Sequence, residues 1–352
     1  MVKITINDNV TKLKQKSKAK NTQDKYDGDW LKFTNYCQNK YLCNPLEVDD
    51  LESAYALTAN YMDWLHEDPE ATVFKGTSNI AGREKINNNP YSASPYKAST
   101  IQRILASITY KYRLNGLQFD RKNPNIAETI SAIVRDEKNL KSSQAKELLK
   151  EDIVKIIDSI PNSEEEYKNI RDKALILIGF YSFCRRSELL GMRFEHLNFA
   201  DDGIQVLIPF SKTDQTGEGR MIFLPATNDK YCPVKALNHW LELAMIESGP
   251  LFYKINKSNT IEKYTMNYKN EKVSLNDASF VLILKKRAAE AGLNDCDKIS
   301  GHSLRIGSIT QARMNGVPTH EIMAQSGHKT TQMIDRYTKL SNIRETSAAK
   351  KI

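Results

Sequence analysis

The chain contains one clear β region in a sequence that otherwise shows helical periodicity. The apolar segments GIQVLIPF (203–210) and RMIFLP (220–225) lie on either side of the polar stretch SKTDQTGEG. Two apolar runs around a Gly-, Asp- and Thr-rich tip predict a β-hairpin with a long polar turn. Because apolar residues elsewhere recur at helical spacing, we expect a mainly α protein with a small antiparallel β-sheet.

The first part of the chain predicts a small all-α domain. Tyr26, Trp30, Phe33 and Cys37 recur at the spacing of one helical face. After a second expected helix within 49–67, the stretch 68–96 contains several prolines and glycines and is long for a loop in a compact domain. We interpret it as a mobile or partner-ordered insertion. Two more helices are expected, at 99–115 and 125–137.

A polar stretch separates this domain from a larger, α-rich one. The segment KNLKSSQAK (138–146) lacks apolar periodicity and is the best candidate for a linker. We place the domains at 1–138 and 148–352, with the linker over 139–147. Helices of the second domain are expected at 149–160, 164–182, 186–197, 233–247, 275–291, 303–315, 319–326 and 330–339.

Charge and apolar content narrow the class of protein. Lys and Arg number 51 against 43 Asp and Glu, so the net charge is +8 and the pI is about 9.0. This excess is compatible with a polyanionic partner, although many soluble proteins without a nucleic-acid role reach it. The longest apolar run, around 174–183, is too short to cross a membrane, and the lysine-rich start is no secretory signal. We therefore expect an intracellular protein.

The cysteines give no sign of a metal centre. The five cysteines are scattered without the spacing of zinc ligands, which predicts reduced thiols. They are Cys37, Cys43, Cys184, Cys232 and Cys296. The sequence also offers no carboxylate cluster for a metal and no phosphate-binding loop, so we expect no metal and no cofactor.

Five polar features of the second domain have an ordinary explanation when each is taken alone. An Arg and a Glu one helical turn apart form surface ion pairs, loop lysines are solvated, and a His/Arg pair or a Gly-His can mark a helix end. A Tyr four residues after a Met is usually half-buried on an amphipathic helix. The features are Arg185 with Glu188, Lys212, His302 with Arg305, His328, and Tyr337.

Taken in order, the five features form a recognisable pattern. The chain shows Arg-x-x-Glu, a hairpin lysine, Gly-His-x-x-Arg, and Gly-His followed nine residues later by Tyr. This order resembles the tyrosine recombinase (phage integrase-type) family. The matching stretches are SFCRRSELLGMRFEHL (182–197), IPFSKTDQTGEGRMIFLP (208–225), SGHSLRIGSITQARMNGVPTHEIMAQSGH (300–328) and KTTQMIDRYTKL (329–340). The first domain is similar to the family's helical, SAM-like core-binding domain.

The resemblance implies a role for each residue. Arg185 and Arg305 would bind the scissile phosphate, and Glu188 would support the site. His302 would be the base, His328 a phosphate ligand, Lys212 the general acid and Tyr337 the nucleophile. Two departures are visible: Ser182-Phe183-Cys184 stands where the family often has Thr-Gly-Leu, and Ser326 where it often has Leu.

These residue types suit phosphodiester cleavage. Two guanidiniums can grip both non-bridging oxygens and stabilise the charge of the transition state. Tyrosine, with a reference pKa near 10, needs a base, and a 5′-alkoxide leaving group needs a proton. A 3′-phosphotyrosyl link keeps the energy of the broken bond, so rejoining needs no ATP. No metal is expected either, because cations of the protein would do what Mg²⁺ often does.

The resemblance also implies partners. Double-stranded DNA would lie between the two domains, held by a homotetramer, with no membrane or small-molecule substrate. Arg103, Lys111 and Arg113 on the helix at 99–115 are the candidates for major-groove contacts. The alternatives are a type IB-like topoisomerase, a hairpin telomere resolvase, and a DNA-binding protein that has lost catalysis.

Overall fold

The computed structural model describes residues 20–67, 96–139, 145–162, 166–209, 219–267 and 272–335. The chain divides into two compact units, Met1–Ser142 and Ser143–Ile352. Nearly all of the expected insertion and the middle of the expected linker lie outside the described residues. Over the described residues the structure is mostly helical with one small antiparallel sheet, which confirms the expected fold class.

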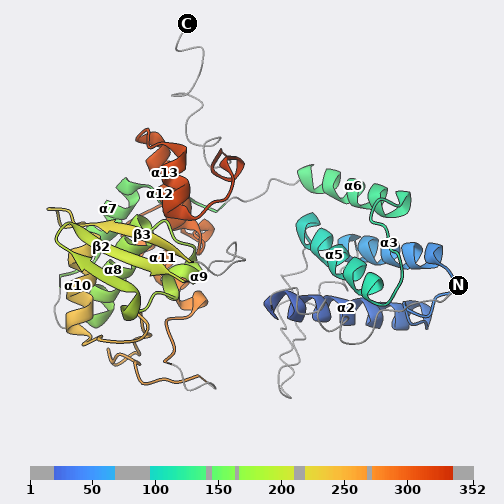
Figure 1. Ribbon diagram of the computed structural model, residues 1–352, viewed down its shortest axis with the longest axis horizontal. Helices are drawn as coiled ribbons and strands as arrows, with labels where there is room; N and C mark the ends of the chain where they lie inside the picture. Colours follow the sequence, from blue (N-terminus) through green and yellow to red (C-terminus); the bar gives the residue numbers. More distant parts are fainter. Residues whose placement is uncertain are drawn as a thin grey trace, which may run out of the picture. The chain divides into compact units, whose positions relative to one another are not determined.

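The described part of the first unit is all helical. Its helices are α2 (Lys20–Tyr41), α3 (Leu51–Glu67), α5 (Ala98–Leu114) and α6 (Pro124–Asn139) (Figure 1). Helix α2 packs on α5, and α3 packs on α6. The core between them is rich in aromatic rings: Phe33, Tyr61 and Tyr112 are almost completely buried. The apolar faces predicted from helical spacing are therefore the faces that pack together.

The sheet of the second unit has three strands in the order β1-β2-β3, all antiparallel. Strands β2 (Gly203–Ile208) and β3 (Arg220–Pro225) are the predicted hairpin. Strand β1 (Leu197–Ala200) was missed, because the sequence predicted a helix over 186–197. That prediction is wrong: helix α9 (Arg186–Leu190) ends at Gly191, and a 3₁₀ turn (Phe194–His196) leads into the strand.

Contacts distant in sequence explain this difference. The backbone N–H of Phe194 donates to the carbonyl of Gly249, and Leu197 pairs with Val206 of β2. These partners give the backbone polar groups hydrogen bonds that a longer α9 would have supplied within the helix. The helical pattern of the segment is thus overridden by tertiary pairing.

Helix α8 (Tyr167–Tyr181) forms the centre of the second unit. It packs against α10 (Pro233–Leu243) on one side and α12 (Ser303–Met314) on the other. Leu175 and Ile178 of α8 are fully buried, and so is Trp240 of α10. Further helices of this unit are α7 (Lys150–Ser159), α11 (Asp277–Glu290) and α13 (Thr319–Ser326), with a 3₁₀ turn at Cys296–Lys298 and helical residues at 331–335. The chain leaves α8 directly into the segment that carries Arg185.

Helix α13 is fixed to the open edge of the sheet. The side-chain amide of Gln325 donates to the carbonyl of Phe223 on β3 at 2.9 Å and accepts from its N–H at 3.4 Å. A side chain thus satisfies backbone groups that would otherwise form an unpaired strand edge. This contact holds the C-terminal end of α13, with Gly327 and His328, beside β3.

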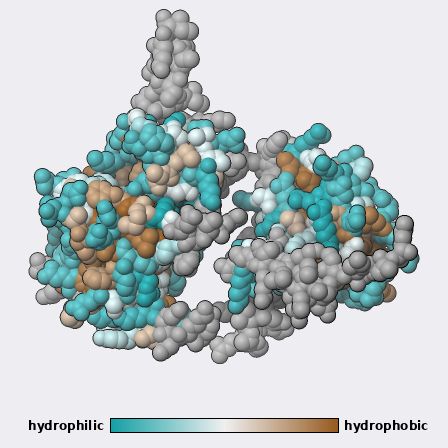
Figure 2. Space-filling view, in the orientation of Figure 1, coloured by the Kyte–Doolittle hydropathy of each residue, from teal (hydrophilic) through white to brown (hydrophobic). Residues whose placement is uncertain are grey.

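The outer face of the sheet is partly apolar. Leu207, Met221 and Phe223 are exposed there, and Figure 2 shows apolar surface over the sheet of the second unit. In the described part of the chain, no helix has the length and apolar character that a membrane span requires.

Candidate active site

The N-terminus of α9 builds the first part of the site. Glu188 lies one turn into the helix and accepts the backbone N–H of Arg185 at 2.9 Å and its Nη1 at 2.8 Å. The Glu188 side chain is 2% exposed and that of Arg185 is 13% exposed, so this is a buried pair. No described residue accepts from Nη2 of Arg185. The fork of Arg185 thus keeps donors for a further anion.

Two more arginines approach the same carboxylate. Nη2 of Arg220, the first residue of β3, lies 2.9 Å from Oε2 of Glu188, and Nη1 of Arg305 lies 4.0 Å from it. Burial acts to raise the pKa of Glu188, but the hydrogen bond and charge of Arg220, followed by the hydrogen bonds of Arg185, lower it overall. Glu188 is therefore an anion at neutral pH, and three cations surround it.

Arg305 and His328 are joined by a hydrogen bond between their side chains. Nη2 of Arg305 lies 3.0 Å from Nε2 of His328, and Oγ of Ser326 lies 2.8 Å from Nδ1. Nη2 also lies 3.4 Å from Nδ1, but Nε2 is the nearer nitrogen; since arginine can only donate, we assign Nε2 as the acceptor and place the ring proton on Nδ1, facing Ser326. Burial and the charges of Arg305, Arg185 and Arg220 lower the pKa of His328 to about 4. His328 is consequently neutral at pH 7.

Arg305 also reaches the turn before α9. Its Nη1 donates to the carbonyl of Phe183 at 2.7 Å. Phe183 has a φ of 57°, in the left-handed region that favours glycine. This position is where the resemblance places a glycine, and the structure gives the reason: the turn aims a carbonyl at Arg305.

The predicted base, general acid and nucleophile are His302, Lys212 and Tyr337, and the structure describes only the first of them. His302 is the N-cap of α12 and is exposed, one turn before the buried Arg305. Lys212 and Tyr337 lie outside the described residues, so their predicted roles stay predictions. Close to Tyr337 in sequence, Ile334 is fully buried in a cluster with Ile309 and Ile322.

Arg220 is the site residue that the sequence analysis missed. The segment RMIFLP (220–225) reads as an ordinary strand, and only its first residue, Arg220, is charged. The available signal was its position, directly after the polar tip that carries the predicted lysine.

The predicted DNA-binding side chains of α5 have protein partners. Arg103 pairs with Asp29 and Lys111 with Asp27, both on α2. Nε of Arg113 donates to the carbonyl of Phe119 at 3.1 Å. A role for these residues on DNA remains a prediction.

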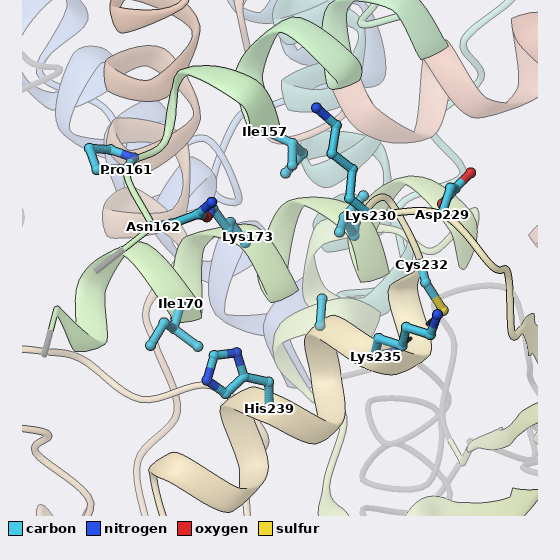
Figure 3. A pocket seen from close by; sticks show the side chains of 12 residues that line it. Ile157, Pro161, Asn162, Ile170, Lys173, Asp229, Lys230, Cys232, Lys235 and His239 are labelled. Atoms are coloured by element: carbon cyan, nitrogen blue, oxygen red, sulfur yellow. Dashed lines mark hydrogen bonds between the residues drawn. The ribbon is translucent and has the colours of Figure 1, made fainter. Parts of the chain in front are cut away.

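Two further features lie outside this group of residues. In the first unit, His66, Glu67 and Asp136 place possible metal-ligand atoms within 4.8 Å of one another, with both carboxylates exposed. In the second unit, a cavity of about 380 Å³ lies between α7, α8 and α10. Figure 3 shows Lys173, Lys230 and Lys235 along its wall, and none of the predicted catalytic residues lines it.

The arrangement defines a class of protein. On a mainly helical domain with a small antiparallel sheet, three arginines surround one buried carboxylate: Arg185, Arg220 and Arg305. Such an excess of guanidinium groups is chemically suited to an anion such as a phosphate. Residues 146–344 match the model of the phage integrase family. The chain belongs to this family, the tyrosine recombinases.

Individual relatives agree with this assignment. The chain is 31% identical over 333 residues to an integrase/recombinase XerD homolog of Selenomonas ruminantium, covering 94% of this chain and 84% of the relative. Its fold is similar to that of the XerH site-specific recombinase bound to a palindromic difH substrate, with a TM-score of 0.57, 17% identity and coverage of 93% and 78% of the two chains. The Tn1549 transposon integrase in complex with transposon right end DNA gives a TM-score of 0.52, 14% identity and coverage of 93% and 92%.

Proposed function

We propose that this protein is a site-specific recombinase that cleaves and rejoins DNA through a covalent 3′-phosphotyrosine at Tyr337. The observation that carries the proposal is the convergence of Arg185 and Arg305 on Glu188, on a chain that belongs to the tyrosine recombinases. Two arginines held by one carboxylate, with a donor of Arg185 unused by described residues, are suited to a phosphodiester.

In this proposal the reaction is an in-line displacement at phosphorus. The Tyr337 oxygen forms the new bond to phosphorus, and the bond from phosphorus to the 5′-oxygen breaks. His302 takes the phenol proton, and Lys212 gives a proton to the departing 5′-oxygen. Rejoining is the reverse attack by a 5′-hydroxyl, on the same or another strand.

Charge complementarity supports this chemistry. Three guanidiniums and the single carboxylate of Glu188 leave a charge of +2 while His328 is neutral. The phosphodiester carries one negative charge and the pentacoordinate transition state two, so the site is better matched to the transition state. Because fixed cations supply this stabilisation, we expect cleavage without a divalent metal.

The proposed partner is double-stranded DNA, held by a homotetramer. Solved relatives of similar fold are complexes with a difH substrate and with transposon right end DNA, and the sequence carries a net charge of +8. Among the predicted contacts on α5, Arg113 is exposed and donates to a backbone carbonyl, whereas Arg103 and Lys111 form ion pairs with aspartates. In this proposal the protein acts inside the cell, where DNA is found.

The test is covalent capture of DNA. The full chain is incubated with duplexes of randomised sequence, adducts that survive SDS are recovered, and the cleaved sequence is rebuilt as a duplex nicked beside the break. We expect an adduct with the wild type and none with Tyr337→Phe. The released strand should carry a free 5′-hydroxyl that polynucleotide kinase labels directly.

Other outcomes would favour the alternative functions. Stable binding of one sequence without any adduct would indicate a DNA-binding protein that has lost catalysis. Adducts that form and reseal only within one strand, with relaxation of supercoils, would indicate a topoisomerase. Closure of each end into a hairpin would indicate a telomere resolvase.

A further inference from the structure

Arg220 is the least expected member of the site. It follows Gly219 at the start of β3, and its side chain is 15% exposed. Its Nη2 donates to Glu188 Oε2 at 2.9 Å and lies 3.5 Å from Sγ of Cys184, the residue before Arg185. One guanidinium group therefore contacts both the residue that holds Arg185 and the turn that leads to it.

The same guanidinium packs against the end of α13. A Cβ on Gly327 would lie 3.0 Å from Cζ and Nη1 of Arg220 and 3.1 Å from Nε. Gly327 has a φ of 70° and is followed directly by His328. The absence of a side chain at Gly327 leaves room for Arg220. Arg220 thus connects three segments of the site: the start of β3, the start of α9, and the end of α13.

The hydrogen bonding of Arg220 is incomplete. Its Nε and Nη1 are buried and have no partner among the described residues. Leaving buried donors unpaired is unfavourable, and an arginine that served stability alone would be expected to have its donors satisfied. A role in the neighbouring anion site would account for a charged residue with these donors at this position.

We propose that Arg220 is a positioning residue of the recombinase site that acts through Glu188. It fixes the Glu188 carboxylate, so that Arg185 is held with its remaining donors toward the scissile phosphate. It also places a third positive charge beside the developing charge of the transition state without touching the phosphate. This inference rests on the proposed function for its role in cleavage.

The first test compares variants on the nicked duplex obtained from the randomised pool. We expect Arg220→Met to slow adduct formation at saturating DNA by about 100-fold, because a misplaced Arg185 amounts to the loss of one preorganised donor, while the Kd for DNA stays within about threefold. Arg220→Lys keeps the charge and should recover at least about tenfold. Lys286→Met removes an exposed cation of α11 and should behave as wild type.

A double-mutant cycle tests the route through Glu188. If Arg220 acts mainly through this carboxylate, Arg220→Met combined with Glu188→Gln should be slower than the worse single variant by no more than about threefold. Multiplication of the two defects, or Arg220→Met cleaving within about threefold of wild type, would overturn the proposal. Circular dichroism and thermal unfolding identify any variant that fails to fold. If Arg220→Met does not fold, the cleavage rate of Arg220→Lys is compared with that of wild type instead.

A second measurement does not depend on DNA cleavage. The ring signals of His328 are followed by NMR as the pH is varied, in wild type, Arg220→Met and Lys286→Met. Removing the nearby charge should raise the pKa of His328 in Arg220→Met alone. A wild type that forms no adduct would refute the proposed function. An unchanged His328 pKa in Arg220→Met would refute the placement of Arg220.

Discussion

Nη2 of Arg305 lies 3.0 Å from Nε2 of His328, and burial of the ring together with this charge keeps the histidine neutral. A guanidinium that donates to Nε2 occupies the lone pair that a proton would need. In the assigned tautomer, Oγ of Ser326 accepts a hydrogen bond from Nδ1–H, so both ring nitrogens have a partner. For His328 to bind a phosphate as a donor, this arrangement must change when DNA enters the site.

Stability should depend on His328 at mildly acid pH. In the unfolded chain a histidine takes up a proton near pH 6.5, whereas the folded pKa of His328 is about 4 because of burial and the charges of Arg305, Arg185 and Arg220. The contribution of neutral His328 to the free energy of unfolding is therefore fully present above pH 6.5. It is lost as the pH falls toward 4, by up to about 3 kcal/mol. Urea unfolding of wild type and His328→Gln between pH 4 and 7 checks this. A parallel pH dependence of the two proteins would contradict it.

Replacing either of the two arginines that we propose to bind the phosphate should abolish most cleavage. We expect Arg185→Ala and Arg305→Ala each to slow adduct formation by at least about 100-fold, comparable to loss of one oxyanion-hole donor. Arg313→Ala is the matched control, because Arg313 lies at the end of the same helix as Arg305 and donates to Thr319. Near-normal cleavage by either site variant would show that the phosphate binds elsewhere.

At Phe183, which lies in a left-handed turn, a glycine variant should be more stable than an alanine variant, the reverse of the usual order. A non-glycine residue in this conformation costs about 1–2 kcal/mol, and alanine keeps that cost while glycine removes it. We therefore expect Phe183→Gly to be more stable than Phe183→Ala by about 1 kcal/mol in chemical denaturation. At Ser182, whose φ is −78°, the alanine variant should be the more stable one. The same order at both positions would argue against strain at Phe183.

The two ion pairs between α5 and α2 should contribute differently to the free energy of unfolding. The Asp29 side chain is 8% exposed, whereas that of Asp27 is 63% exposed. Arg103→Ala leaves a buried carboxylate without its cation and should cost about 1–3 kcal/mol. Lys111→Ala should cost below about 1 kcal/mol. Thermal unfolding ranks the two variants, and adding Asp29→Asn to Arg103→Ala should restore part of the loss.

Cleavage should continue after removal of divalent metal ions. The charge that a metal would neutralise is carried by Arg185, Arg220 and Arg305, which are fixed around Glu188. We expect the same rate of adduct formation with EDTA as with added Mg²⁺. Strict dependence on Mg²⁺ would require a different mechanism.

Much of the fold could be read from local patterns. The helical faces of α2 and α5 and the hairpin of β2 and β3 follow from the spacing of apolar residues, because burial on one face requires a fixed repeat. Strand β1 could not be read this way, since its partner Val206 and the anchoring carbonyl of Gly249 are supplied by other segments.

The sequence by itself determined the family and the order of Arg185, Glu188, Arg305 and His328, because spacing and residue type are properties of the chain alone. Only the tertiary structure decided which groups meet. Arg220 is 32 residues from Glu188, and the sheet brings its guanidinium to 2.9 Å from the carboxylate. The carbonyl of Phe183 and the ring of His328 likewise meet at Arg305, which is contributed by a different helix. Hydrogen bonds between distant segments form only after the core has packed, and no local pattern encodes them.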